Sequence, residues 1–251
     1  NKTIDGIIHE KTVKLLNSNI FVNKQQNEDI TLKIKKALKS NKSKKFFFGS
    51  DFNYVKAENN FMLYEDSFGS MLLPEPNVFG DHQLANISTS IATARNLFKI
   101  KDEDIKKGIT KIEFKGRLQE IKSGNLKNLV GSNRLFCDGG HNINSSIAIA
   151  KWIKQQNQSV HLVVGMMKDK DHLGFIGSFK DIVKSITLID IPNQSDSISK
   201  EEFKEKLKEI NKKIILSNSI KESIQSMKKY QNETCLIIGS LYLVGEVLNL
   251  N

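Results

Sequence analysis

From Arg117 to the end of the chain, short apolar runs alternate with stretches of helical periodicity. Runs of this length suit strands that are buried on both faces of a sheet. They are RLFCD (134–138), SVHLVVGMM (159–167), SITLIDI (185–191), KIILS (213–217) and TCLIIGS (234–240). Helical stretches follow near 143–156, 171–184, 199–211, 219–230 and 240–249. This alternation predicts an α/β domain with a Rossmann-like, mostly parallel sheet flanked by helices.

The first part of the chain follows a different pattern. We expect helices at 3–16, 28–40 and 82–98, strands at 19–23 and 44–50, and a hairpin at 60–76. Pro74 and Pro76 close the hairpin and mark a boundary, because proline cannot donate a hydrogen bond to a sheet. Residues 101–116 predict a short helix followed by a link. We therefore divide the chain into two domains, residues 1–112 and 113–251.

The net charge of +10 is concentrated near the start of the chain, where residues 1–56 hold twelve lysines and five acidic residues. The lysine-rich run 33–45 predicts a solvated helix face and its trailing loop. Arginines are few and no aromatic stacking motif accompanies the lysines, so we expect no nucleic-acid partner. No apolar run reaches the roughly 18 residues that span a bilayer, so we expect no membrane partner. Cys137 and Cys235 lie inside apolar runs, which indicates buried thiols of a cytoplasmic protein.

The segment Asp138-Gly-Gly-His141-Asn142 lies where the first strand of the predicted sheet ends and the next helix begins. Ligands of parallel sheets bind at the carboxyl ends of the strands. Glycines let the backbone approach such a ligand, and the N–H groups at a helix start favour an anion. Asp138 can accept hydrogen bonds from a ribose or a cationic group. The alternative is that Asp138 or Asn142 only caps the helix.

Three further segments combine polar residues with a strand end or a domain junction. KGRLQ (115–119) places Arg117 where it can bind phosphate or carboxylate, or form an ordinary salt bridge of a linker. GMMKDKDH (165–172) can steer a charged substrate or form a solvated loop of paired charges. GSLYLVGEV (239–247) opens the last helix and can present N–H donors to an anion, although its leucines and valines belong to the core.

Six segments, in this order and spacing, resemble the folylpolyglutamate synthase / dihydrofolate synthase family of Mur-ligase-like enzymes. They are TIDGIIHEK (3–11), GDHQLANISTSIATA (80–94), GRLQ (116–119), DGGHN (138–142), GMMKDKD (165–171) and IIGSLYLVGEV (237–247). The resemblance implies ATP-dependent ligation of L-glutamate to dihydropteroate, to folylpolyglutamate, or to both, through an acyl phosphate. It implies ATP and Mg²⁺ as cofactors, with a dihydropteroate or folate substrate as the partner of glutamate.

The resemblance also implies roles for individual residues. Gln83, Asn86, Arg117 and Asp138 are expected to bind the nucleotide. His141 is expected near the incoming glutamate or the transferred phosphoryl group, as a catalytic residue. Lys11 is expected to be carbamylated and to support a magnesium ion.

The chain departs from the family pattern at several positions. Gly140 stands where the family has Ala, Ile143 where it has Pro, and residues 12–14 read Thr-Val-Lys where it has Ala-Gly-Ile. The phosphate-binding motif G-x-x-x-x-G-K-[ST] is not present in these 251 residues. We therefore interpret residues 1–112 as the C-terminal remnant of a P-loop ATPase domain, expect the other metal ligands upstream of Asn1, and expect the fragment to be inactive alone.

Two other functions remain open on the sequence. One is a different Mur-type amino-acid ligase. The other is a non-catalytic protein that binds a nucleotide or a polyanion. In each case we expect a monomer.

Overall fold

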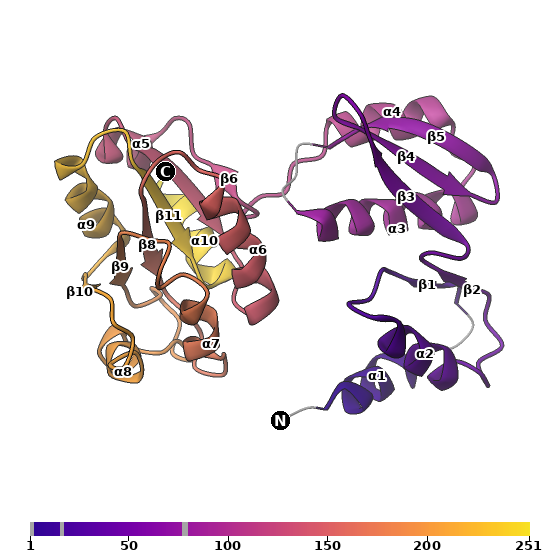
Figure 1. Cartoon of the computed structure of the whole chain (residues 1–251), viewed down its shortest axis with the longest axis horizontal. Coiled ribbons are helices and arrows are strands. Elements are labelled where there is room, and N and C mark those ends of the chain that lie inside the picture. Colours follow the sequence, from indigo (N-terminus) through magenta and orange to yellow (C-terminus); the bar gives the residue numbers. More distant parts are fainter. Residues whose placement is uncertain (1–2, 16–17, 77–79) are drawn as a thin grey trace. The chain divides into compact units, whose positions relative to one another are not determined.

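The computed structural model describes residues 3–15, 18–76 and 80–251. The chain divides into two compact units, Asn1–Glu113 and Phe114–Asn251 (Figure 1). No helix in the described ranges is long and apolar enough to cross a bilayer.

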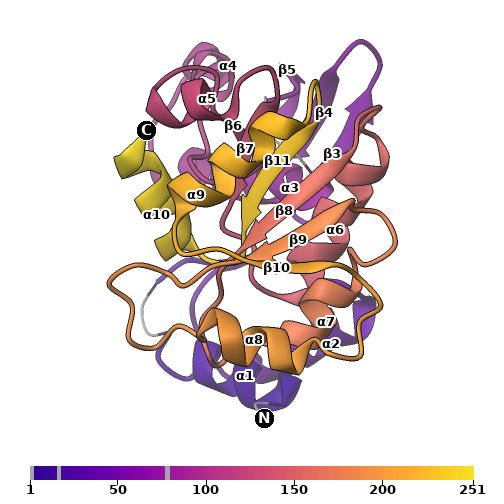
Figure 2. The same ribbon diagram turned by 90° about the vertical axis from the view of Figure 1, so that its left-hand side faces the viewer.

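The second unit is built on a six-stranded sheet, which confirms the predicted α/β class. Its strand order, which Figure 2 lets the reader follow, is β10-β9-β8-β11-β7-β6. The strands are β6 (Gln119–Glu120), β7 (Arg134–Asp138), β8 (Val160–Val164), β9 (Ser185–Leu188), β10 (Ile214–Leu216) and β11 (Thr234–Ile238). All neighbours are parallel except β6, which runs antiparallel to β7. The two-residue β6 was not predicted, because the sequence reads as a link there.

Helices cover both faces of this sheet, since side chains of successive strand residues point to opposite faces. They are α5 (Asn125–Val130), α6 (Ile143–Lys154), α7 (His172–Gly177), α8 (Lys200–Lys206), α9 (Ile220–Gln225, followed by a 3₁₀ turn at Ser226–Lys229) and α10 (Leu241–Leu250). Leu135 and Cys137 belong to the apolar cluster that also contains side chains of α5, α9 and α10. Phe136 faces the other way and meets Trp152 of α6 edge-on, with 4.9 Å between ring centroids. The predicted helices at 171–184 and 199–211 end early, at Gly177 and Lys206.

The strand register brings the carboxyl ends of four strands to one edge. Asp138 pairs with Ile238, Ile238 with Val164, and Val164 with Leu188. The segments that follow these residues therefore begin side by side. Cys137 and Cys235 are fully buried in neighbouring strands, and burial raises the pKa of each thiol to about 12, so both stay protonated and unreactive.

In its described residues (3–15, 18–76 and 80–113), the first unit contains two small sheets and four helices. They are α1 (Ile4–Thr12), β1 (Ile20–Val22), α2 (Glu28–Ala37), β2 (Lys45–Phe47), β3 (Phe52–Ala57), β4 (Phe61–Asp66), β5 (Gly69–Pro74), α3 (Asp81–Leu97) and α4 (Asp102–Thr110). β1 and β2 form a parallel pair, and β3, β4 and β5 an antiparallel sheet. The predicted hairpin is confirmed as β4–β5. β3 was not predicted as a third strand, because its exposed residues show no clear apolar alternation.

The predicted helix near 82–98 is confirmed as α3, whose apolar stripe packs on the antiparallel sheet. Ile87 and Ile91 share one buried cluster with Met62, Tyr64 and Leu73. α2 follows the expected charge pattern, because Lys35, Lys36 and Lys39 are exposed. These packing contacts fix the orientation of α3 and thereby of the polar residues on its first turns.

A cluster of polar and aromatic side chains around the buried His161 lies at the opposite, amino-terminal edge of the second unit's sheet. His161 is 2% exposed, and its Nδ1 lies 2.7 Å from Ser185 Oγ. Its Nε2 lies 2.5 Å from Glu233 Oε2, and its ring stacks on Tyr230. Burial lowers the pKa of His161 below its usual range, and the hydrogen bond to Glu233 offsets part of this change.

We expect this cluster to make the second unit less stable in acid. A histidine that stays neutral when folded binds fewer protons than the unfolded chain, so its contribution is present above a pH of about 6.5 and is lost as the pH falls. His161→Gln should therefore reduce the slope of the unfolding free energy between pH 7 and 5. The measurement is urea unfolding followed by the fluorescence of Trp152, the single tryptophan. His9→Gln, in the first unit, is the control, because it leaves His161 and its partners in place. Equal slopes for His161→Gln and the wild type would contradict the assignment.

Candidate functional site

The carboxylate of Asp138 ties the end of β7 to the turn that carries Arg117. Its Oδ2 accepts a hydrogen bond from the backbone N–H of Leu118 at 2.7 Å. Its Oδ1 accepts one from the N–H of Gly140 at 2.6 Å. Asp138 is 6% exposed, and hydrogen bonds of this kind compensate for removing a carboxylate from water.

Asn142, and not Asp138, caps the helix that follows. Asn142 Oδ1 accepts from the N–H of Ser145 at 2.9 Å, and Ser145 Oγ accepts from the N–H of Asn142 at 3.1 Å. This reciprocal pair is a capping box. The capping alternative therefore holds for Asn142, while Asp138 is engaged elsewhere.

The turn around Arg117 has an unusual backbone. Gly116 has φ +68° and Leu118 has φ +43°, in the left-handed region that a leucine rarely adopts. Such a conformation costs on the order of 1–3 kcal/mol and persists only when its surroundings hold it. The Asp138 bond to Leu118 does so, together with a 2.8 Å bond from the N–H of Gly116 to Gln119 Oε1.

This turn places Arg117 beside the glycines that follow β7. The N–H of Gly139 donates to the carbonyl of Gly116 at 2.8 Å. A Cβ atom on Gly139 would lie 3.1 Å from Arg117 Nη1. The structure thus brings Arg117, Asp138 and Gly139 together at the carboxyl edge of the sheet. Their expected role in nucleotide binding stays a prediction.

His141 is held by one ring nitrogen and keeps the other available. Its Nδ1 donates to the carbonyl of Gly139 at 2.9 Å. The Nε2 atom is then the nitrogen that a ligand could contact, since the ring is only partly buried. This geometry suits proton exchange or hydrogen bonding with a ligand at the sheet edge.

Two other segments lie at this edge. One makes a close backbone contact, and the other carries paired charges. Gly239 has φ +114°, and a Cβ atom there would lie 2.5 Å from the carbonyl oxygen of Gly165. Lys170 pairs with Asp169 at 2.8 Å, and Asp171 caps α7. These contacts favour the interpretation of residues 168–171 as a solvated, self-paired loop.

Gln83 and Asn86 lie next to each other on α3 in the first unit. Asn86 Nδ2 donates to Gln83 Oε1 at 3.2 Å. Asn23, just after β1, donates through Nδ2 to Asn86 Oδ1 at 2.6 Å. Asn23 was not predicted as a site residue, although it directly follows the apolar run IFV at a strand end. A common site for Asn86 with Arg117 and Asp138 stays a prediction.

Lys11 is a solvent-facing residue of α1, with a side chain that is 74% exposed and Nζ 3.7 Å from Glu10 Oε1. Within the described ranges, no three His, Cys, Asp or Glu side chains are grouped so that they could hold a metal ion. Carbamylation of Lys11 stays a prediction.

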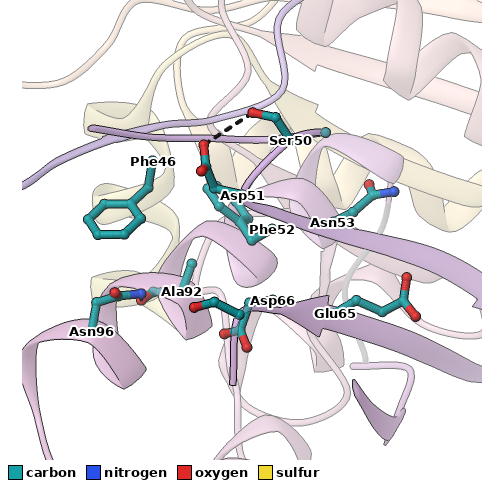
Figure 3. A pocket seen from close by; sticks show the side chains of 11 residues that line it. Phe46, Ser50, Asp51, Phe52, Asn53, Glu65, Asp66, Ala92 and Asn96 are labelled. Carbon is teal, nitrogen blue, oxygen red and sulfur yellow. Dashed lines mark hydrogen bonds between the residues drawn. The ribbon is translucent and has the colours of Figure 1, made fainter. Parts of the chain in front are cut away.

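A cavity of about 590 Å³ in the first unit is not suited to phosphates (Figure 3). Its lining includes the carboxylates of Asp51 and Glu65, which repel an anion, and that of Asp66, which is paired with Arg95 at 2.9 Å. It also includes Asn96, ten residues beyond Asn86 and therefore roughly 15 Å along the helix. This cavity is thus distinct from the surroundings of Gln83 and Asn86.

The sequence pattern described as "Mur ligase, glutamate ligase domain" matches residues 116–241. The chain belongs to this family. The matched residues begin at the Arg117 turn and end at the start of α10, so they contain Asp138 and His141. These residues, called the Mur ligase domain below, all lie within the second unit of the chain.

Similar proteins are longer than this chain. The dihydrofolate synthase/folylpolyglutamate synthase of Bacillus subtilis is 26% identical over 208 residues, which are 79% of this chain and 44% of that protein. The chain thus spans about half the length of the curated relatives it matches.

Solved structures share the fold of the chain. E. coli FolC in complex with DHPP and ADP has a TM-score of 0.77 and 19% identity, covering 98% of this chain and 56% of that one. The folylpolyglutamate synthase/dihydrofolate synthase of Yersinia pestis, complexed with AMPPNP and Mn ion, has a TM-score of 0.76 and 18% identity, with the same coverage.

The close contact between Gly239 and the Gly165 carbonyl allows the backbone geometry at the sheet edge of the Mur ligase domain to be tested. Gly239→Ala should destabilise this domain by about 2–3 kcal/mol, because it combines a left-handed φ with a clash against the Gly165 carbonyl. Gly245→Ala is the matched control, since nothing lies within 4 Å of its Cβ position in α10. The control should be neutral or stabilising by up to about 1 kcal/mol. Urea unfolding measures both, and equal midpoints would contradict the geometry.

Proposed function

We propose that the protein containing this chain ligates L-glutamate to dihydropteroate, to folylpolyglutamates, or to both. In this reaction ATP transfers its γ-phosphoryl group to the substrate carboxylate and leaves as ADP. The amine of glutamate then attacks the acyl phosphate, loses a proton, and displaces phosphate as the amide forms. The observation that carries the proposal is the Arg117–Asp138–His141 arrangement inside the matched Mur ligase domain. The relatives named above support the folate substrate.

Each residue at the sheet edge has a task in this proposal. Arg117 offers a guanidinium beside Gly139, where it can bind an anionic group of ATP. Asp138 holds the turn that presents Arg117. His141 offers Nε2 to the glutamate amine or to the transferred phosphoryl group. Gln83 and Asn86 of the first unit contribute to the same nucleotide.

ATP and a divalent ion, Mg²⁺, complete the proposed reaction, and the complexes of the relatives support this cofactor set. We place residues 1–112 as the end of a P-loop ATPase domain. We place the enzyme in the cytoplasm as a monomer.

The deciding experiment uses the protein made from the complete coding sequence. We expect ADP release that requires both glutamate and either dihydropteroate or a reduced folate. ADP release with another amino acid and a cell-wall precursor would favour a different Mur-type ligase. Nucleotide binding without any turnover would favour a non-catalytic protein. Residues 1–251 alone contain no P-loop and should release no ADP.

Asp138 and His141 should differ in the step that they affect. Asp138→Ala should mainly raise the KM for ATP, because the Arg117 turn loses its support. His141→Ala should lower kcat or raise the KM for glutamate more than it changes ATP affinity. Each loss should be on the order of 1.5–3 kcal/mol, or roughly ten- to a hundredfold. The exposed Asp181→Ala is the control, and near-wild-type kinetics for both site variants would reject the assignment.

Lys11 can be tested by chemical rescue. Lys11→Ala should lower activity, and short carboxylic acids should restore part of it by replacing the carboxylate of a carbamylated lysine. Lys14→Ala, a second exposed lysine near the end of the same helix, should keep wild-type activity. A Lys11→Ala enzyme with full activity would count against carbamylation.

A further inference from the structure

Two side-chain amides meet where β1 ends against α3. Asn23 Nδ2 donates to Asn86 Oδ1 at 2.6 Å, across 63 residues of sequence. Asn86 in turn donates through Nδ2 to Gln83 Oε1 at 3.2 Å, and Gln83 is 5% exposed. Three amides therefore form one chain of hydrogen bonds.

The direction of this chain is set by a backbone N–H group. The N–H of Lys24 donates to Asn23 Oδ1 at 2.7 Å, and a backbone N–H can only donate. Asn23 therefore turns its Oδ1 toward Lys24 and its Nδ2 toward Asn86. Asn86 must then present its carbonyl oxygen to Asn23 and its Nδ2 to Gln83.

This direction decides what Asn86 offers to a ligand. An asparagine amide has two N–H donors and one carbonyl. One donor is used by Gln83 and the carbonyl accepts from Asn23. The second N–H has no partner among the described residues. Asn86 is exposed, so this N–H is accessible.

We propose that Asn23 is a positioning residue of the nucleotide site, which acts by fixing the Asn86 amide so that it presents an N–H donor. The inference rests on the proposed function, in which Asn86 contacts ATP. The matching ligand group is a hydrogen-bond acceptor of the nucleotide. In this proposal Asn23 does not contact the ligand itself, because Asn86 lies between them.

The test is Asn23→Asp in the complete protein. The aspartate keeps one oxygen that accepts from the N–H of Lys24. Its second oxygen replaces Nδ2 of Asn23, the group that donates to Asn86. Asn86 then has to turn over to donate to this carboxylate, so its carbonyl faces Gln83 and the ligand. ATP affinity, measured by calorimetry, should fall roughly three- to tenfold. The KM for glutamate and the unfolding midpoint should stay unchanged.

Asn27→Asp is the matched control, because it makes the same exchange four residues further on. Asn27 caps α2 by accepting from the N–H of Ile30 at 3.0 Å, and aspartate caps equally well. This variant adds the same charge without touching Asn86 and should bind ATP as the wild type does. In an Asn86→Ala background, Asn23→Asp should have no further effect on ATP affinity, because its action passes through Asn86.

The outcomes separate this inference from the proposed function. Unchanged ATP affinity in Asn23→Asp, an equal loss in Asn27→Asp, or an additive loss in the Asn86→Ala background would each overturn the positioning role. ATP binding with the expected pattern but without glutamate ligation would support the positioning role and reject only the ligase activity. A wild-type protein that binds no nucleotide would overturn both.

Discussion

The carboxylate of Asp138 is the contact on which the arrangement at the sheet edge depends. Its two oxygens bind N–H groups from both sides, Leu118 before the strand and Gly140 after it. The first bond holds a leucine in a left-handed conformation that would otherwise be unfavourable. The second shapes the glycine turn that leads into the capping box of α6. The buried Asp138 carboxylate thus holds both backbone segments that carry Arg117 and His141.

Much of the fold could be predicted because apolar periodicity carries the information directly. The runs at β7, β8, β9 and β11 are buried on both faces, so each appears in the sequence as a continuous apolar segment. β10 is only half-buried, but its residues Ile214, Ile215 and Leu216 are all apolar. β6 carries no such signal, because Gln119 and Glu120 are only half-buried and pair through their backbones with Cys137 and Phe136. α5 was also missed, since six residues are too few to show helical periodicity.

The candidate site was predictable in its residues but not in its contacts. Position after a strand end singled out Asp138, position at the domain junction singled out Arg117, and the family resemblance added Gln83 and Asn86. The hydrogen bond from Leu118 to Asp138 spans 20 residues and depends on how β6 lies beside β7. The bond from Asn23 to Asn86 depends on α3 packing near the end of β1. Such contacts follow from tertiary packing, and a single sequence contains no pattern that specifies them.

The three histidines of the Mur ligase domain differ in how many of their ring nitrogens have hydrogen-bond partners, and this difference distinguishes a structural histidine from one that a ligand can contact. Both ring nitrogens of His161 have partners, and its ring is stacked and buried, so it can exchange no proton with a ligand without breaking the core. His172 is buried against Phe203 and donates to the carbonyl of Met167, and burial lowers its pKa. His141 is fixed through Nδ1 alone and is partly exposed at the edge where the strands end. Fixed orientation together with one available nitrogen is what proton transfer to a bound substrate requires, and among these three residues only His141 combines the two.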